Sequence, residues 1–212
     1  MIYLDSALLG DAEIAMQYGW VKGITTNPTL LAKSPYSPSE TLSQLRKITS
    51  GHLYYQLFSN DFDSMIKEGY RAYEIIGKNL VLKIPATTVG FRASSRLSQE
   101  ITCSITAIYS DYQAALSAEA GAKYAIAYVN RATRLLGDGL DLVRGISHIL
   151  QGSSTEILAA SLKSPQEAAD ALKAGADHLT LPLNILQSMP ENELSKATVD
   201  EFRQNGIGLL GI

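Results

Sequence analysis

The chain has 212 residues and a formal net charge of −3, with 46% hydrophobic and 18% charged residues. This length and composition predict one globular domain, residues 1–212, and exclude a disordered chain. The slightly negative charge and the lack of any Lys/Arg run exclude a general attraction to nucleic acid or to acidic membranes.

The cysteine content and the lengths of the apolar runs exclude further classes of protein. The single cysteine, Cys103, cannot form an intramolecular disulfide and has no partner thiol for a Cys-based zinc site. Residues 1–5 lack a secretory pattern, and no apolar run reaches the roughly 18 residues of a membrane-spanning helix. We therefore expect a cytoplasmic protein.

Eight short β-rich runs recur along the chain between longer helical patterns. Several are nearly continuous in Val, Ile, Leu and Ala, which is typical of parallel strands covered on both faces. The predicted strands are residues 1–5, 21–25, 52–58, 80–84, 101–105, 123–129, 156–160 and 178–182.

Helix start and stop signals lie between these runs. Residues 37–40 (SPSE), 110–113 (SDYQ) and 164–167 (SPQE) each place a Ser cap three residues before Glu or Gln. The Ala-Gly-Ala phrases at 120–122 and 174–176 each end a predicted helix, because Gly adopts the left-handed conformation of a helix C-terminus.

This strand–helix alternation predicts parallel strands joined by right-handed crossovers. Eight strands in about 200 residues favour a closed (β/α)8 TIM barrel over an open doubly wound sheet. No Gly-x-Gly-x-x-Gly follows the first strand, which weakens that alternative. A further helix is predicted at about 193–205, and the apolar tail to residue 212 needs cover from its own chain or a neighbouring subunit.

In a parallel barrel the active site forms at the carboxyl ends of the strands, where we expect Lys83 to be the central residue. Lys83 interrupts the apolar strand 80–85 (LVLKIP). Burial disfavours the charged form of lysine, and a neutral amine is the nucleophile that attacks a ketone. The ordinary alternative is a lysine that reaches solvent or pairs with a carboxylate.

Other polar residues lie at or near six further strand ends, which makes seven with the strand of Lys83. Each has an ordinary explanation: Asp5 as a helix cap, Asn27 as a turn residue, Gln56 as a structural hydrogen-bonding group, Arg131 in a surface ion pair and Ser161 as a cap. Gathered around one buried lysine, they predict a site. The candidate set is Asp5, Thr25, Asn27, Gln56, Thr106, Tyr128, Arg131 and Ser161.

The histidines and Cys103 do not compete with this site. His52, His148 and His178 are scattered with no i,i+4 pair, so no metal site is expected. Cys103 is expected to be a small buried strand residue.

Four segments resemble the transaldolase family. Residues 23–30 (GITTNPTL) resemble its Gly-Val-Thr-Thr-Asn-Pro-Ser signature, and residues 81–87 (VLKIPAT) resemble the segment that holds its Schiff-base lysine. Residues 127–131 (AYVNR) and 158–161 (LAAS) are similar to later barrel motifs. The matches follow one another in order, and the resemblance covers nearly the whole chain.

The resemblance implies one of two activities. Transaldolases transfer a dihydroxyacetone unit from a ketose phosphate to an aldose phosphate, whereas fructose-6-phosphate aldolases cleave the ketose to dihydroxyacetone and glyceraldehyde 3-phosphate. Transaldolases usually have Glu at the position of Gln56 and Phe at that of Tyr128, so this chain is similar to the small aldolase subfamily. A non-catalytic sugar-phosphate-binding barrel is a third alternative.

The expected mechanism follows from the resemblance. Lys83 attacks the C2 ketone to give an iminium, which accepts electrons when the C3–C4 bond breaks. Asp5 shuttles protons, with a water held by Gln56, Thr106 and Tyr128. Neither a metal nor an organic cofactor is expected.

The remaining candidates are expected to bind the substrate. Thr25 and Asn27 are assigned to the dihydroxyacetone hydroxyls, and Arg131 and Ser161 to the distal phosphate. Residues 132–139 differ from the glycine-rich stretch of the family, which makes Arg134 an alternative phosphate ligand. Family members of this size form homo-oligomers, pentamers or decamers, in which the C-terminal helix reaches a neighbouring subunit.

Overall fold

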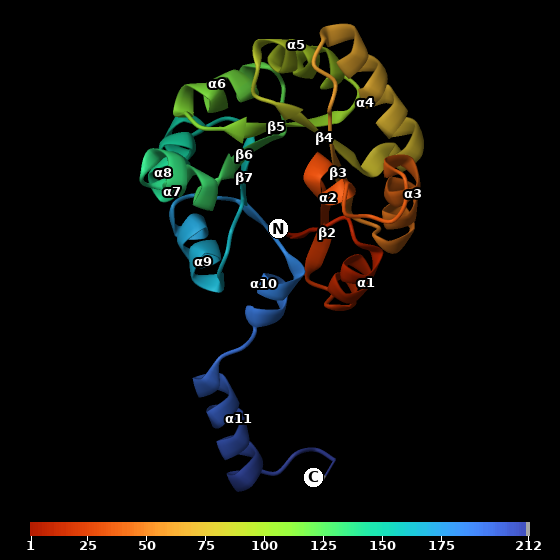
Figure 1. Ribbon diagram of the computed structural model, residues 1–212. Coiled ribbons are helices and arrows are strands. Elements are labelled where there is room, and N and C mark those ends of the chain that lie inside the picture. Colours follow the sequence, from red (N-terminus) through yellow and green to blue (C-terminus); the bar gives the residue numbers. More distant parts are fainter. Residues whose placement is uncertain (211–212) are drawn as a thin grey trace.

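Eight parallel strands form a closed barrel in the order β1 to β8, with helices around the outside, in the computed structural model, which describes residues 1–210 (Figure 1). This confirms the predicted TIM barrel. The strands are β1 (Ile2–Asp5), β2 (Val21–Thr25), β3 (His52–Gln56), β4 (Leu80–Pro85), β5 (Thr102–Ile108), β6 (Tyr124–Tyr128), β7 (Glu156–Ala160) and β8 (His178–Leu181).

Eleven α-helices and one 3-10 turn, η1 (Gly77–Asn79), connect and follow the strands within residues 1–210. The helices are α1 (Leu9–Gln17), α2 (Pro28–Leu31), α3 (Pro38–Ile48), α4 (Phe62–Ile76), α5 (Thr88–Leu97), α6 (Asp111–Glu119), α7 (Val129–Leu136), α8 (Gly139–Ile149), α9 (Pro165–Lys173), α10 (Leu183–Ser188) and α11 (Glu193–Asn205).

Two of the three predicted helix caps form. The Ser37 side chain closes a capping box with Glu40 at the start of α3, and the Ser164 side chain caps α9. The prediction for α6 is wrong. Its N-cap, Ser110, makes no side-chain cap hydrogen bond, and the Gln113 amide oxygen accepts from the Tyr109 N–H instead of from the Ser110 N–H.

Both predicted glycine stops are confirmed. Gly121 after α6 has φ +72° and Gly175 after α9 has φ +109°, a backbone region that residues with a Cβ rarely adopt. Gly23 on β2 has a different reason: a Cβ there would collide with the backbone of His52. Glycine therefore lets β2 and β3 approach closely below the Thr-Thr-Asn-Pro segment.

Two apolar cores hold the fold together. The larger one lies between the strands and the surrounding helices, and includes Leu4, Leu53, Leu82 and Ile105. The smaller one fills the barrel interior. It is built from Tyr3, Tyr54, Val81, Tyr124, Ile126, Leu158 and Ala160, with Tyr128 packed against it.

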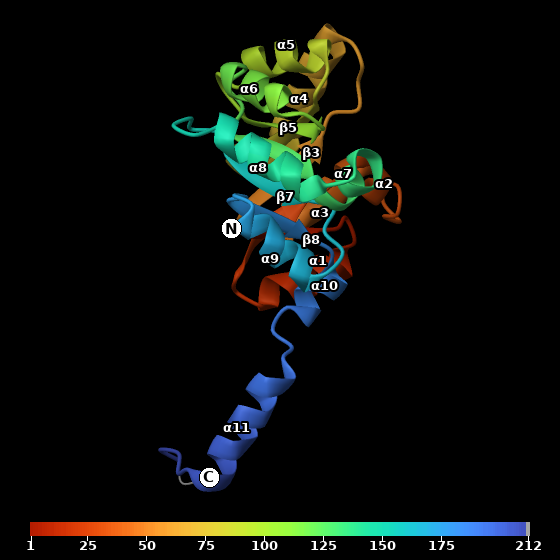
Figure 2. The ribbon, with the colours of Figure 1, turned by 90° about the vertical axis from the view of Figure 1, so that its left-hand side faces the viewer.

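Helix α11 extends away from the barrel, as the two perpendicular views show (Figure 2). Its bounds, Glu193–Asn205, match the prediction, and it has no buried residue. Leu194 and Phe202 are 79% and 68% exposed. No helix of residues 1–210 has the length and apolar content needed to span a bilayer.

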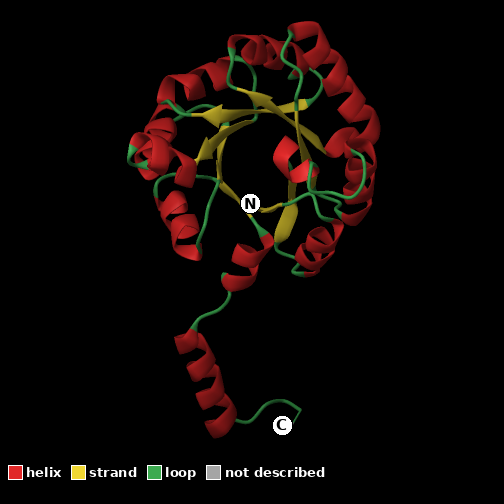
Figure 3. Cartoon of the chain, viewed as in Figure 1, coloured by secondary structure: helices red, strands yellow, loops and turns green. Residues whose placement is uncertain are grey.

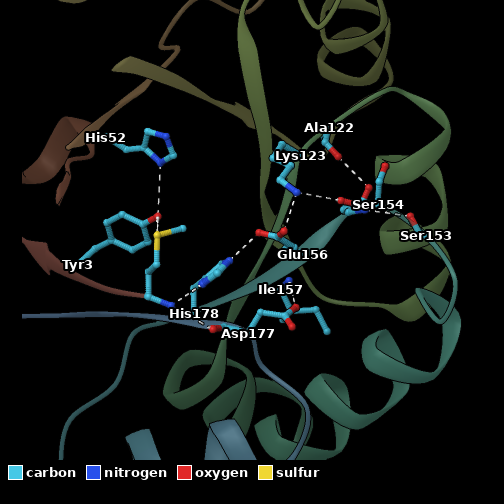
Figure 4. Close-up of polar contacts among 12 residues, drawn as sticks. Tyr3, His52, Ala122, Lys123, Ser153, Ser154, Glu156, Ile157, Asp177 and His178 are labelled. Atoms are coloured by element: carbon cyan, nitrogen blue, oxygen red, sulfur yellow. Dashed lines mark hydrogen bonds and ion pairs between the residues drawn. The ribbon is translucent and has the colours of Figure 1, made fainter. Parts of the chain in front are cut away.

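Figure 3 shows the strands as a ring seen approximately along the barrel axis. The two ends of this ring carry different side chains. At the amino ends, the Glu156 carboxylate pairs with Lys123 at 2.5 Å and with His178 Nε2 at 2.7 Å, while the Tyr3 hydroxyl lies 3.4 Å from His52 Nδ1 (Figure 4). The fold thus gathers two histidines that are far apart in sequence. Although burial acts to raise it, hydrogen bonds from Lys123 and His178 lower the pKa of Glu156.

Candidate active site

The carboxyl ends of the strands surround a cavity of about 420 Å³, within the range of roughly 300–1,000 Å³ usual for small-molecule sites. Helix α2 covers part of this mouth (Figure 3). All the predicted site residues except Thr25 and Thr106 line it. The lining is Asp5, Asn27, Pro28, Thr29, Leu30, Gln56, Lys83, Tyr128, Arg131, Ala160, Ser161, Lys163 and Thr180.

Lys83 lies in the cavity wall and is only 3% exposed. Its neighbours on β4, Leu82 and Ile84, are fully buried. Lys83 Nζ donates to the Thr26 carbonyl oxygen at 2.9 Å, and it forms no ion pair within residues 1–210. The side chain therefore neither reaches bulk solvent nor pairs with a carboxylate, and its nitrogen is available to a ligand.

Asp5 lies at the end of β1 and presents its carboxylate to the same cavity. It does not cap α1, whose N-cap is Leu8. Asp5 Oδ1 accepts a hydrogen bond from Thr25 Oγ1 at 2.9 Å. Thr25, predicted as a substrate ligand, is fully buried and outside the cavity lining, so the structure places it behind Asp5 instead.

Tyr128 and Thr106 form a hydrogen-bonded pair beside Lys83. The buried Thr106 hydroxyl donates to the Tyr128 hydroxyl oxygen at 2.8 Å. Because a phenol has one proton and this bond uses only its oxygen, Tyr128 keeps its own proton for a group in the cavity. Thr106 thus acts through Tyr128 and does not itself line the cavity.

Gln56, in register with Lys83 on β3, and Asn27, after β2, present amide groups to the cavity on the other side of β4 from Tyr128. Gln56 Oε1 is buried without a hydrogen-bond partner in the described chain. Such an oxygen costs about 1–3 kcal/mol, which a donor on a bound water or ligand would offset. Asn27 Oδ1 caps α2 by accepting from the Leu30 N–H at 2.9 Å, leaving its NH2 group for the cavity.

Arg131 lies in the first turn of α7, directly after β6, and Ser161 lies on the loop that follows β7. The Arg131 guanidinium lies 5.0 Å from the centre of the Tyr128 ring, a cation–π arrangement that fixes its direction. Ser161 has φ +60°, an uncommon conformation for a residue with a side chain. Arg134 is exposed and outside the cavity lining, so Arg131 is the better placed of the two arginines.

Glu167 on α9 joins the start of α7 to the loop after β7. Its carboxylate accepts from Asn130 Nδ2 at 3.0 Å and from the Lys163 N–H at 2.8 Å. The Asn130 N–H in turn donates to the Ser161 carbonyl oxygen at 3.2 Å. The start of α7, which carries Arg131, and the loop that carries Ser161 are therefore held in one relative position.

Sequence reasoning missed three polar cavity residues, Thr29, Lys163 and Thr180. Thr180 on β8 stands out afterwards as a polar residue between Leu179 and Leu181, much as Lys83 interrupts the apolar run of β4. Lys163 lies two residues after Ser161 and adds a cation to the wall. Together with Arg131 it outnumbers the single carboxylate of Asp5, which favours an anionic ligand.

No set of three or more His, Cys, Asp or Glu side chains takes a metal-binding arrangement in the part of the chain that the structure describes. Burial raises the pKa of the Cys103 thiol to about 12, so this side chain is not a thiolate nucleophile near neutral pH.

A (β/α)8 barrel with a buried lysine, a carboxylate and a cationic rim at one mouth is a barrel equipped for carbonyl chemistry on an anionic ligand. Residues 2–208 match the family model described as Transaldolase/Fructose-6-phosphate aldolase. The chain belongs to this family.

Relatives over nearly the full length support this assignment. A probable transaldolase of Nitrosopumilus maritimus is 36% identical, over 95% of this chain and 92% of its own. One from a Hydrogenobaculum species is 36% identical over 94% and 93%.

Solved structures share the fold at low identity. An orotidine 5'-monophosphate decarboxylase from Metallosphaera sedula has a TM-score of 0.61 and 15% identity, covering 93% of this chain and 94% of that one. A mandelate oxidase has a TM-score of 0.64 and 16% identity, covering 94% and 71%. These two likenesses show the barrel alone.

Proposed function

We propose that this protein is a Schiff-base enzyme that breaks the C3–C4 bond of a ketose phosphate through Lys83. The observation that carries the proposal is the placement of Lys83: a nearly buried amine, without a carboxylate partner in the described chain, in the wall of a cavity that also holds Asp5. Such an amine is a nucleophile toward a ketone.

The reaction begins when the neutral Lys83 amine adds to the C2 carbonyl. Loss of water from the carbinolamine gives an iminium, which accepts the electron pair of the C3–C4 bond. The C4 hydroxyl loses its proton to the Asp5 carboxylate through a water, and the aldehyde fragment leaves. The three-carbon fragment then remains on Lys83 as an enamine.

Substrate orientation is assigned to the two ends of the cavity. The distal phosphate is bound by Arg131, Ser161 and Lys163, which supply two cations and a hydroxyl from the start of α7 and the loop after β7, two segments joined by Glu167. The Asn27 NH2 group binds a hydroxyl of the dihydroxyacetone unit. Phosphate binding at the carboxyl-end face of a TIM barrel, by the loops after β7 and β8, is common in this fold.

The geometry favours protonation and hydrolytic release of dihydroxyacetone, the aldolase outcome. The Tyr128 phenol keeps a proton to donate, and Gln56 adds neither a base nor a negative charge beside the iminium. The second candidate is transfer of the enamine to an aldose phosphate. It is supported by the relatives, which are named probable transaldolases.

Two assays test the proposal. Incubation with dihydroxyacetone and borohydride is expected to leave a three-carbon adduct on Lys83, located by mass spectrometry. An active enzyme without an adduct on Lys83 would contradict the mechanism. Glyceraldehyde 3-phosphate release from fructose 6-phosphate is then measured with and without erythrose 4-phosphate; absolute dependence on this acceptor favours transfer.

We further propose a cytoplasmic homo-oligomer in which α11 docks on a neighbouring copy. The exposed Leu194, Val199 and Phe202 on a helix that leaves its own barrel support this. A chain ending at residue 192 is expected to have a smaller oligomer mass by light scattering, and an unchanged number of subunits would contradict the role of α11.

A further inference from the structure

The two strands beside β1 each contribute a threonine hydroxyl to a series of hydrogen bonds that ends at Asp5. Thr25 on β2 is paired in register with Asp5, and Thr180 comes from β8, on the other side of β1. The two hydroxyl oxygens lie 2.5 Å apart, and both side chains are almost completely buried. Thr25 Oγ1 also lies 2.9 Å from Asp5 Oδ1.

The number of hydroxyl protons determines which group is the donor in each of these two hydrogen bonds. An ionised carboxylate only accepts hydrogen bonds, so the single hydroxyl proton of Thr25 points to Asp5 Oδ1. Thr25 must then accept from Thr180, whose hydroxyl is the donor. The order is Thr180 to Thr25 to Asp5. Donation by Thr180 polarises the Thr25 hydroxyl and strengthens its bond to the carboxylate.

The second oxygen of the Asp5 carboxylate, Oδ2, is free to take part in the reaction. Asp5 Oδ2 accepts no hydrogen bond from another residue in the described chain, while the carboxylate lines the cavity. Because Oδ1 is held from behind, rotation of the carboxylate is restricted and Oδ2 stays directed at the substrate.

We propose that Thr180 is a positioning residue that acts on Asp5 only through Thr25. This inference rests on the proposed function, in which Asp5 moves the proton. Its distinctive consequence is non-additivity: once Thr25 has lost its hydroxyl, the hydroxyl of Thr180 has no further route to Asp5.

The test is a double-mutant cycle with Thr25→Val, Thr180→Val and the double variant, measured as kcat and KM for fructose 6-phosphate. Loss of a hydrogen bond to a charged group predicts that Thr25→Val lowers kcat about 30-fold, and loss of a neutral one predicts about fivefold for Thr180→Val. The double variant is expected to stay near 30-fold instead of about 150-fold. KM should change less than about twofold, and Thr180→Ser should restore kcat.

Thr155→Val is the matched control, because Thr155 is a buried threonine whose hydroxyl donates to the Ala122 carbonyl oxygen at the other end of the barrel. It should lower the melting temperature without changing kcat. Effects of Thr25→Val and Thr180→Val that multiply, or a rise in KM without loss of kcat, would show that Thr180 acts directly on substrate and would overturn the inference.

Borohydride trapping separates this inference from the proposed function. Both variants should still form the Lys83 adduct, since neither hydroxyl contacts Lys83. A wild-type enzyme that forms no adduct defeats the Schiff-base mechanism, and with it the role of Thr180. A wild-type enzyme that is trapped normally, with a Thr180→Val variant of unchanged kcat, defeats the positioning role alone.

Discussion

Replacing Tyr128 by Phe separates the two candidate outcomes, because it removes one hydroxyl and keeps the ring under Arg131. The lost groups are a proton donor to the enamine side of the cavity and the acceptor of the 2.8 Å bond from Thr106. A positioned acid is worth about 10²- to 10⁴-fold in rate. In the variant the buried Thr106 hydroxyl has lost its acceptor, which costs about 1 kcal/mol of folding free energy. This is too little to unfold a barrel of this size.

We therefore expect Tyr128→Phe to lower release of dihydroxyacetone about 100-fold. Transfer to erythrose 4-phosphate needs the aldehyde in place of that proton, so it should fall less than about tenfold. The ratio of transfer to release then rises at least about tenfold, measured by coupled assays with and without the acceptor.

Tyr109→Phe is the control for this variant. The Tyr109 ring packs edge-on against Tyr128 at 6.5 Å between centroids and lies outside the cavity lining. Its ratio should equal that of the wild type. An equal loss of release and transfer in Tyr128→Phe would refute the role of the phenol as proton donor.

Three more predictions concern single side chains. Lys83→Met should abolish activity and the borohydride adduct without lowering the melting temperature, because an apolar chain of similar length replaces a buried amine; residual trapping would move the Schiff base elsewhere. Arg131→Ala should raise KM for fructose 6-phosphate about 10- to 100-fold and leave KM for dihydroxyacetone within about twofold, whereas Arg134→Ala should change neither; equal rises for both substrates would contradict a phosphate ligand. Burial, and to a smaller extent nearby His178, lower the pKa of His52 below its unfolded value of 6.5. The folded state therefore binds this proton less readily, and stability is lost as pH falls below 6.5. His52→Gln should reduce the fall in melting temperature between pH 7 and pH 5, and an unchanged fall would exclude His52 as its source.

The fold could be predicted because its signals are local. Each strand is a short apolar run, and the stops at Gly121 and Gly175 depend on one backbone conformation that glycine adopts easily. Strand ends were less accurate: the run 52–58 ends at Gln56 in the structure, and 101–105 continues to Ile108. These limits depend on neighbouring strands, which sequence patterns do not contain.

The site could be predicted only as far as strand ends reveal it. Lys83 is conspicuous in an apolar strand, whereas Thr25 looks the same whether its hydroxyl faces substrate or Asp5. The contact between Thr25 and Thr180 joins residues 155 positions apart across β1. Likewise, His52 and His178 come together only when the barrel closes. Such roles are set by register and closure.

The two ends of the barrel use charged side chains in opposite ways. At the amino ends, the Glu156 carboxylate is satisfied by Lys123 and His178, so its charge is neutralised within the fold. At the carboxyl ends, Lys83 and Arg131 have no ion-pair partner in the chain as described, and neither does Asp5. Groups left unpaired in a cavity are free to interact with a ligand, and interactions gained only in the transition state accelerate the reaction. The pairing of charges, more than their number, therefore distinguishes the end that stabilises the barrel from the end where we place the chemistry.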